Sequence, residues 1–104
     1  MKKNEIKNAA DEKKIAEVGE KEDRERESQL ADLRFILGSP QGRRFIWRLL
    51  GHCRVFSSVF NHSGSMTYYN SGMQDVGHFI QAEVIEAKKE AYFEMMRENE
   101  KGSK

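Results

Sequence analysis

The sequence lacks the residues from which disulfides and membrane spans are built. It contains one cysteine, which cannot form a disulfide within the chain, and this fits a reducing compartment. No apolar run exceeds four residues, whereas a helix needs about 20 apolar residues to cross a bilayer. No apolar stretch follows the N-terminal lysines, so no secretory signal is predicted. We therefore expect a soluble, intracellular protein without membrane contact, a condition that a particle assembled inside a cell also satisfies.

Hydrophobic residues are scarce for a chain of this length. Of 104 residues, 38% are hydrophobic and 34% are charged. Residues 1–28 contain only three large aliphatic side chains, those of Ile6, Ile15 and Val18. The chain has room for one small domain, and a core below roughly 70–80 residues supplies only a few kcal/mol. Self-association or docking on a partner is therefore a natural supplement to folding.

Charge is nearly balanced overall, at +1, but it is unevenly distributed. Residues 1–28 carry eight basic and nine acidic residues, residues 29–60 carry five and one, and residues 61–104 carry five and seven. The middle of the chain is therefore a local basic region between two mildly acidic ones.

The first 28 residues have the composition of a solvated helical arm. Alanine, glutamate and lysine favour helix, and Glu17–Lys21 is an i,i+4 pair of favourable orientation. A helix without a buried face is marginal in water. We expect disorder over roughly the first ten residues and a solvated helix from about Asp11 or later to residue 37.

A tight connection between two helices is predicted at residues 38–40. Leu30, Leu33 and Leu37 recur at helical spacing, Phe35 and Ile36 widen their stripe, and Gly38 is placed to cap the helix. Ser39 is a good N-cap, and proline suits the first position of the next helix. Two helices joined so tightly form a helical hairpin or a corner.

The pattern after Pro40 predicts two further helices and a kink. The second runs from Pro40 to about Cys53, and the third begins between Thr67 and Ser71 after a linker at 61–65. Lys88-Lys89 marks a kink or a turn into a last helix. The following residues are predicted to form the contact between the second and third helices: Phe45, Ile46, Leu49, Leu50 and Cys53 on one side, and Val76, Ile80 and Val84 on the other.

The predicted fold is therefore all-α, a small bundle of three to four helices. A charged arm occupies residues 1–28, the helical domain residues 29–97, and a frayed tail residues 98–104. Within the domain, Gly42 is expected to allow a close approach by a neighbouring helix or by Phe35, because glycine otherwise weakens a helix by up to about 1 kcal/mol.

Candidate chemistry is weak. His52, Cys53, His62 and His78 invite a zinc site, but zinc ligands usually include a close chelating pair. Adjacent residues on a helix point about 100° apart. No nucleophile or phosphate-loop motif is present. We predict no enzyme activity, no catalytic residue, no metal and no cofactor.

A basic strip is the best candidate for partner binding. Its residues are Arg43, Arg44, Trp47, Arg48 and Arg54. Arginine beside an aromatic ring can bind phosphate and stack on bases, and tryptophan and arginine are equally enriched at protein interfaces. The plain alternative is a solvated face whose arginines pair with the acidic helices. No sequence-specific DNA-reading motif is present, so any nucleic-acid binding would be non-specific.

Two stretches resemble a known family. The stretch Asp32–Leu50, with its Gly38–Gly42 turn, resembles the leading motif of a small protein family from tailed bacteriophages, exemplified in the short-tailed Bordetella phage. The stretch Tyr69–Gly77 resembles the second motif, departing from it at Met73, where a basic residue is usual. The resemblance covers about residues 30–97. It implies a protein encoded among head-morphogenesis genes, with no established activity and no catalytic residue to transfer.

Three hypotheses for function follow. The leading one is a non-enzymatic phage structural or assembly protein, a head, portal-proximal or internal component. It is expected to contact other phage structural proteins or itself, as a homo-oligomer, in the host cytoplasm or the virion. The second is a nucleic-acid-associated accessory protein that uses its arginines. The third is a small inhibitor of a host protein.

Overall fold

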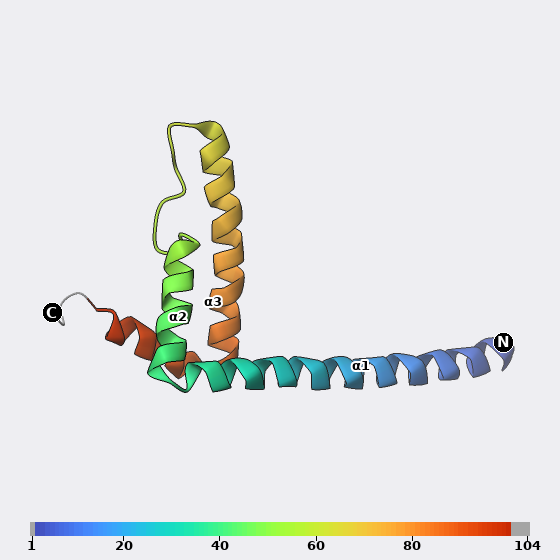
Figure 1. Cartoon of the computed structure of the whole chain (residues 1–104). Coiled ribbons are helices and arrows are strands. Elements are labelled where there is room, and N and C mark those ends of the chain that lie inside the picture. Colours follow the sequence, from blue (N-terminus) through green and yellow to red (C-terminus); the bar gives the residue numbers. More distant parts are fainter. Residues whose placement is uncertain (1, 101–104) are drawn as a thin grey trace.

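The structure is a computed structural model that describes the backbone of residues 2–100 and the side chains of residues 9–100. Within that range it contains three helices and no strand: α1 (Lys2–Leu37), α2 (Pro40–His52) and α3 (Gly64–Glu98). The predicted all-α class is confirmed. Helices α2 and α3 stand side by side, and α1 crosses their base and projects away as a single helix (Figure 1). The molecule is consequently long and thin, with extents of 70 × 38 × 16 Å.

Helix α1 is continuous from Lys2 to Leu37, so it begins upstream of the start predicted near Asp11. Nearly all of its described side chains before Arg26 are exposed. The division into arm, domain and tail stays a prediction, and residues 101–104 of the predicted tail lie outside the described residues.

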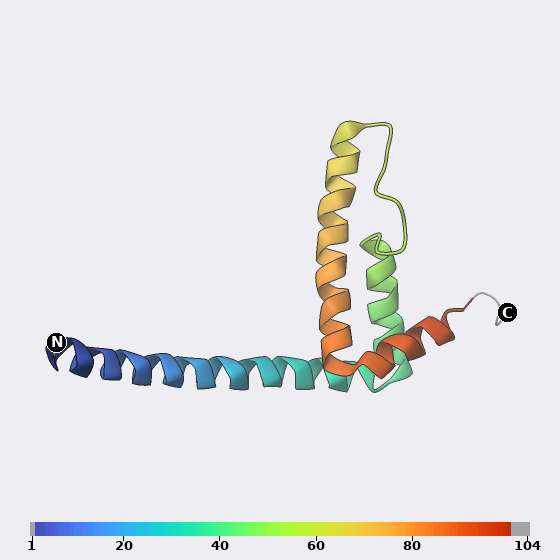
Figure 2. The ribbon, with the colours of Figure 1, turned by 180° about the vertical axis from the view of Figure 1, so that it is seen from behind.

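The turn between α1 and α2 has the predicted chemistry. The Ser39 hydroxyl accepts a hydrogen bond from the Gly42 backbone N–H at 3.0 Å, and Pro40 occupies the first position of α2. A Cβ on Gly42 would lie 1.8 Å from the carbonyl oxygen of Ile36. The predicted reason for this glycine, a close approach by a neighbouring segment, is confirmed. The short connection turns the chain through a corner, because α1 runs across the direction of α2 (Figures 1 and 2).

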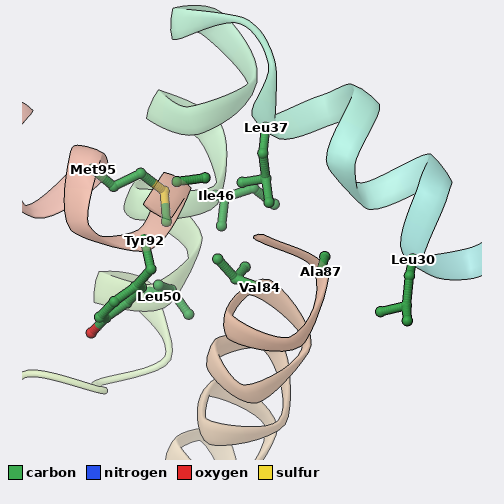
Figure 3. Close-up of a cluster of buried hydrophobic side chains, with 9 residues drawn as sticks. Leu30, Leu37, Ile46, Leu50, Val84, Ala87, Tyr92 and Met95 are labelled. Atoms are coloured by element: carbon green, nitrogen blue, oxygen red, sulfur yellow. The ribbon is translucent and has the colours of Figure 1, made fainter. Parts of the chain in front are cut away.

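The core lies where the three helices cross. Figure 3 shows how its side chains converge from α1, α2 and both parts of α3. Its buried members are Leu30, Leu37, Ile46, Leu50, Val84, Ala87, Ala91, Tyr92 and Met95. Leu33, Trp47, Val55 and Ile80 pack against it from the edges. The core is small, as the composition predicted, and it sits at the base of the upright helices.

The predicted contact face was partly wrong. Ile46, Leu50 and Cys53 are buried, but the Phe45 side chain is 51% exposed. On α3, Val84 is buried, whereas Val76 is 55% exposed. The cause is that α2 packs on α3 through one side only, so apolar residues beside that contact remain uncovered. Phe35 and Ile36, expected to widen the buried stripe of α1, are exposed for the same reason.

Helix α3 begins earlier than predicted and bends where predicted. Ser63 caps it by accepting a hydrogen bond from the Met66 backbone N–H, so the start is Gly64 and the predicted linker is shorter. Lys88 has non-helical angles, φ −164° and ψ 94°, which confirms the kink. The segment after the kink turns across the foot of α2 (Figure 2). This turn brings Tyr92 and Met95 into the core.

Within the described residues, no helix is both long enough and apolar enough to span a bilayer.

Candidate protein-interaction surface

Arg43 lies inside the fold. Its side chain is buried, with the residue 8% exposed. The guanidinium donates hydrogen bonds to the Glu98 carboxylate, the nearest at 2.8 Å, and to the Leu37 carbonyl at 2.9 Å, and Glu94 lies 3.6 Å away. The hydrogen bonds that Arg43 donates to Glu98 raise the pKa of Arg43 and lower the pKa of Glu98. Arg43 therefore joins α1, α2 and the end of α3, and it does not face a partner.

Arg44 and Arg48 lie on the outside of α2, one helical turn apart, and both are exposed. The Arg48 guanidinium lies 5.4 Å from the centre of the Phe45 ring, within cation–π range. Among the described side chains, neither arginine forms a salt bridge. We call Arg44, Phe45, Trp47 and Arg48 the arginine face.

Trp47 forms one edge of the arginine face. Its ring stacks on Phe56, with centroids 4.7 Å apart and planes inclined by 27°. The inner side of the indole packs against the core, so Trp47 is half-buried. One side of a rigid aromatic pair is thus left at the surface, held in place by the fold.

Arg54 belongs to the loop that follows α2. It adopts a positive φ of 61°, and its guanidinium donates a hydrogen bond to the Ser58 carbonyl at 3.3 Å. Its own carbonyl accepts a hydrogen bond from the Gln74 amide at 2.7 Å. The structure therefore brings Arg44, Trp47 and Arg48 together and places Arg54 apart from them, where it holds the loop against α3.

The charge distribution explains why the arginine face stays unpaired. The sequence has no acidic residue between Asp32 and Asp75. Other arginines do pair with acidic helices: Arg26 binds Glu83 and Glu86, and Arg34 binds Glu27. The plain alternative, neutralisation by the acidic helices, thus describes arginines beyond this face, whereas Arg44 helps Arg43 to lower the pKa of Glu98 without forming a salt bridge to it.

A second uncovered surface lies on α3. Tyr68, Tyr69, Phe79 and Met96 are all exposed there. At the end of α1, Phe35 is 85% exposed. The signal for this surface was present in the sequence, since residues 64–82 contain a single charged residue, Asp75. A helix that faced water on its outer side would carry more charge.

The candidate metal ligands do not gather. In the part of the chain with described side chains, no three residues of the types His, Cys, Asp and Glu lie close enough to hold an ion. Cys53 is buried, and its Cβ lies 2.7 Å from where a Cβ on Gly77 would stand. Its thiol is therefore packed where α3 approaches most closely. The absence of enzyme activity, metal and cofactor stays a prediction.

Comparison with known families gives one match. A family model described as Bbp19-like phage protein matches residues 33–97. The match covers both sequence motifs except Asp32, the arginine face and the whole of α2, and it leaves out the entire arm of residues 1–28. No match was found among curated proteins or solved structures.

Proposed function

The chain belongs to the Bbp19-like phage protein family, and we propose that this phage protein is a non-enzymatic component of virion structure or assembly. It would act by protein contact, as a head, portal-proximal or internal component. The fold offers contact surfaces on three sides of a thin molecule: the arm, the arginine face and the outer side of α3.

The observation that carries the proposal is the amount of apolar surface that the single chain leaves in water. Its exposed large side chains outnumber those of its core. They are Ile15, Val18, Phe35, Ile36, Phe45, Phe56, Phe60, Met66, Tyr68, Tyr69, Val76, Phe79, Ile85, Phe93 and Met96. Large exposed apolar patches on a small protein mark sites of interaction. Burying them on other proteins completes a core that the chain cannot complete alone.

The arginine face has the composition of an interface centre. Tryptophan and arginine are the residues most enriched at binding hot spots. Trp47 is fixed by Phe56, and Arg48 is held over Phe45, so less side-chain entropy is lost on binding. A partner that supplies carboxylates would meet two guanidinium groups that form no salt bridge among the described residues.

The proposal is tested by recovering a tagged full-length chain from infected cells. We expect phage structural proteins to be recovered with it after nuclease treatment and at high salt, because an apolar contact does not depend on nucleic acid. The variant Arg44→Glu with Arg48→Glu should weaken that recovery at least tenfold. The control Lys13→Glu with Lys14→Glu changes charge equally on the arm and should weaken recovery less than the arginine variant. Loss of every phage protein after nuclease treatment would overturn the proposal.

A second candidate function is favoured by the same unpaired arginines. With no acidic residue between Asp32 and Asp75, the middle of the chain could contact phosphate without internal competition. Such binding weakens steeply as salt rises. Fluorescence anisotropy with labelled DNA and RNA oligonucleotides at low salt tests this candidate, and the absence of binding under those conditions would exclude it.

Recovery of one host enzyme, with the chain absent from particles, would instead favour a host-inhibitor role.

A further inference from the structure

The upright part of α3 carries a second apolar stripe that no described part of the chain covers. Tyr69, Gly72, Val76 and Phe79 follow one another at spacings of three, four and three residues, the spacing of a coiled-coil seam. Tyr69 is 61% exposed and Phe79 is 63% exposed, with Val76 between them. We call these four residues the α3 stripe.

The α3 stripe is distinct from the face that α3 uses within the fold. The inward face is marked by the buried residues Asn70, Gly77 and Val84, seven residues apart. Each lies one residue beyond a position on the line of the stripe, which places the two faces about 100° apart around the helix. The α3 stripe therefore belongs to the outer side of the helix and is no continuation of the core.

Gly72 has no role within the single chain. A Cβ added there would meet no atom within 4 Å, unlike one on Gly42 or Gly77. Glycine inside a helix costs about 1 kcal/mol relative to alanine. Gly51 is equally free of contacts, but Gly72 differs from it in lying in the middle of the α3 stripe. A glycine on a helix surface allows a second helix to approach closely.

We propose that the α3 stripe binds the same stripe of a second copy in an antiparallel pair. With the two helices centred on residue 74, Tyr69 of one copy faces Phe79 of the other, and Gly72 faces Val76. Large residues then meet ring to ring, and the smallest residue meets a branched one, so the surface is complementary to itself. A two-fold interface requires this reciprocity: if residue i of one copy contacts residue j of the other, then residue j of the first contacts residue i of the second.

The charges around the α3 stripe determine how pairing with a second copy would respond to salt. Glu83 and Glu86 follow Phe79 at the same spacing, and both bind Arg26 of α1. Helix α1 therefore covers the end of the α3 stripe nearest the core. Above them Asp75 is the single charge beside the stripe. Two Asp75 side chains would face each other near the two-fold axis, so salt should strengthen the pair by screening them. An attraction to a basic partner would respond to salt in the opposite sense.

The shape of the molecule leaves room for the second copy. The arm of α1 projects from the side of α3 that lies away from α2, so α1 and α3 form the inner corner of an L (Figures 1 and 2). A second α3 laid antiparallel in that corner contacts the first without meeting α2. This inference deepens the proposed function and rests on it in one respect, that the exposed surfaces are protein contacts.

The experiment uses the purified full-length chain alone, so its result is independent of any phage partner. Sedimentation equilibrium at micromolar concentrations should give about twice the 12.1 kDa of one chain, with tighter association at higher salt. The variant Val76→Glu with Phe79→Glu should sediment as a single chain with an unchanged helical CD spectrum. The matched control Phe35→Glu with Met96→Glu, at exposed positions outside the α3 stripe, should remain a dimer.

Cysteine cross-linking tests the antiparallel register. In a Cys53→Ala background, the double variant Gly72→Cys with Val76→Cys should form disulfides between copies. Each single variant should not, because equivalent residues would be offset by about 6 Å along the axis in addition to the sideways distance between the helices, which together carry the Cα atoms beyond the roughly 7 Å that a disulfide allows. Cross-linking of either single variant, a single-chain mass at every concentration, or a dimer that survives Val76→Glu with Phe79→Glu would overturn the inference. If the chain is a monomer but still recovers phage proteins from infected cells, the pairing of two copies is overturned and the proposed function still stands.

Discussion

At the scale of single residues, Arg43 and Arg44 are chain neighbours with opposite surroundings. Arg43 is hydrogen-bonded to Glu98 and to the end of α1, whereas Arg44 is exposed and forms no salt bridge among the described residues. Helical spacing does separate them, because Arg43 lies three and seven residues before the buried Ile46 and Leu50, but it does not identify the partner of Arg43. The segment that buries and pairs Arg43 follows the kink at Lys88, more than 40 residues away along the chain.

The two arginines should therefore differ when each is replaced. We expect Arg43→Ala to lower the free energy of unfolding by about 2 kcal/mol, since it strands the Leu37 carbonyl and leaves Glu98 without its partner. Arg44→Ala should change it by less than about 0.5 kcal/mol, as for most surface substitutions. Urea unfolding at one protein concentration measures both. Equal effects of the two variants would contradict the assigned roles.

Gly42 and Gly51 make a second matched pair, both within α2. Gly42→Ala places a Cβ against the Ile36 carbonyl, a backbone atom that cannot move aside, and should cost roughly 2 kcal/mol or more. Gly51→Ala meets nothing within 4 Å and should stabilise the fold by up to about 1 kcal/mol. Thermal unfolding of the two variants beside the wild type gives the sign of each effect. A stabilising Gly42→Ala would show that the corner between α1 and α2 is looser than the structure has it.

At the scale of elements, two arginine–glutamate clamps hold α3 to the rest of the molecule. Arg26 of α1 binds Glu83 and Glu86 on the upright part, and Arg43 of α2 binds Glu98 on the part beyond the kink. These hydrogen bonds lower the pKa values of Glu83 and Glu98 from their ordinary 4.5. Each carboxylate thus stabilises the folded chain as long as it is ionised.

A pH dependence follows from those shifts. Because the folded pKa values lie below 4.5, the contribution of the clamps is complete above that pH and is lost as the pH falls through the folded values. We expect the melting temperature to be flat from pH 7 to about 5 and to fall below about 4.5. The fall should be shallower in Glu98→Gln, which has one clamp fewer to titrate. CD melts across that range measure both curves, and a melting temperature that rises on acidification would contradict the clamps.

The elements were largely predictable, and their contacts were not. The Ser39-Pro40 start of α2, the reason for Gly42 and the kink at Lys88 all follow from local chemistry, and each is confirmed. Phe45 and Val76 were placed in the core because periodicity finds an apolar face without saying how much of it a neighbour covers. In this chain the apolar faces are wider than the internal contacts, so periodicity overstates the core.

At the scale of the whole molecule, stability is concentrated where the three helices cross. The core residues lie in α1 from Leu30 onward, in α2 and in α3 from Val84 to Met95. The arm and the upper half of α3 extend from that crossing with few buried side chains of their own. This architecture exposes long helical surfaces in a chain of only 104 residues.

Hydrogen exchange should show this gradient directly. We expect amides of α1 before Arg26 to exchange with little protection, because no tertiary contact stabilises their helix there. Amides of α1 from Leu30 to Leu37 and of α2 should be protected to near the global free energy of unfolding. Exchange monitored by mass spectrometry separates the two parts of α1 in one experiment. Equal protection along the entire helix would mean that another copy or a ligand covers the arm.

The central claim is that this phage protein works by being part of an assembly. Its most direct test is quantitative mass spectrometry of purified phage particles and of purified assembly intermediates. We expect the chain to be present in mature particles or in assembly intermediates at a fixed copy number relative to the major head protein. Its absence from both mature particles and intermediates would contradict the account.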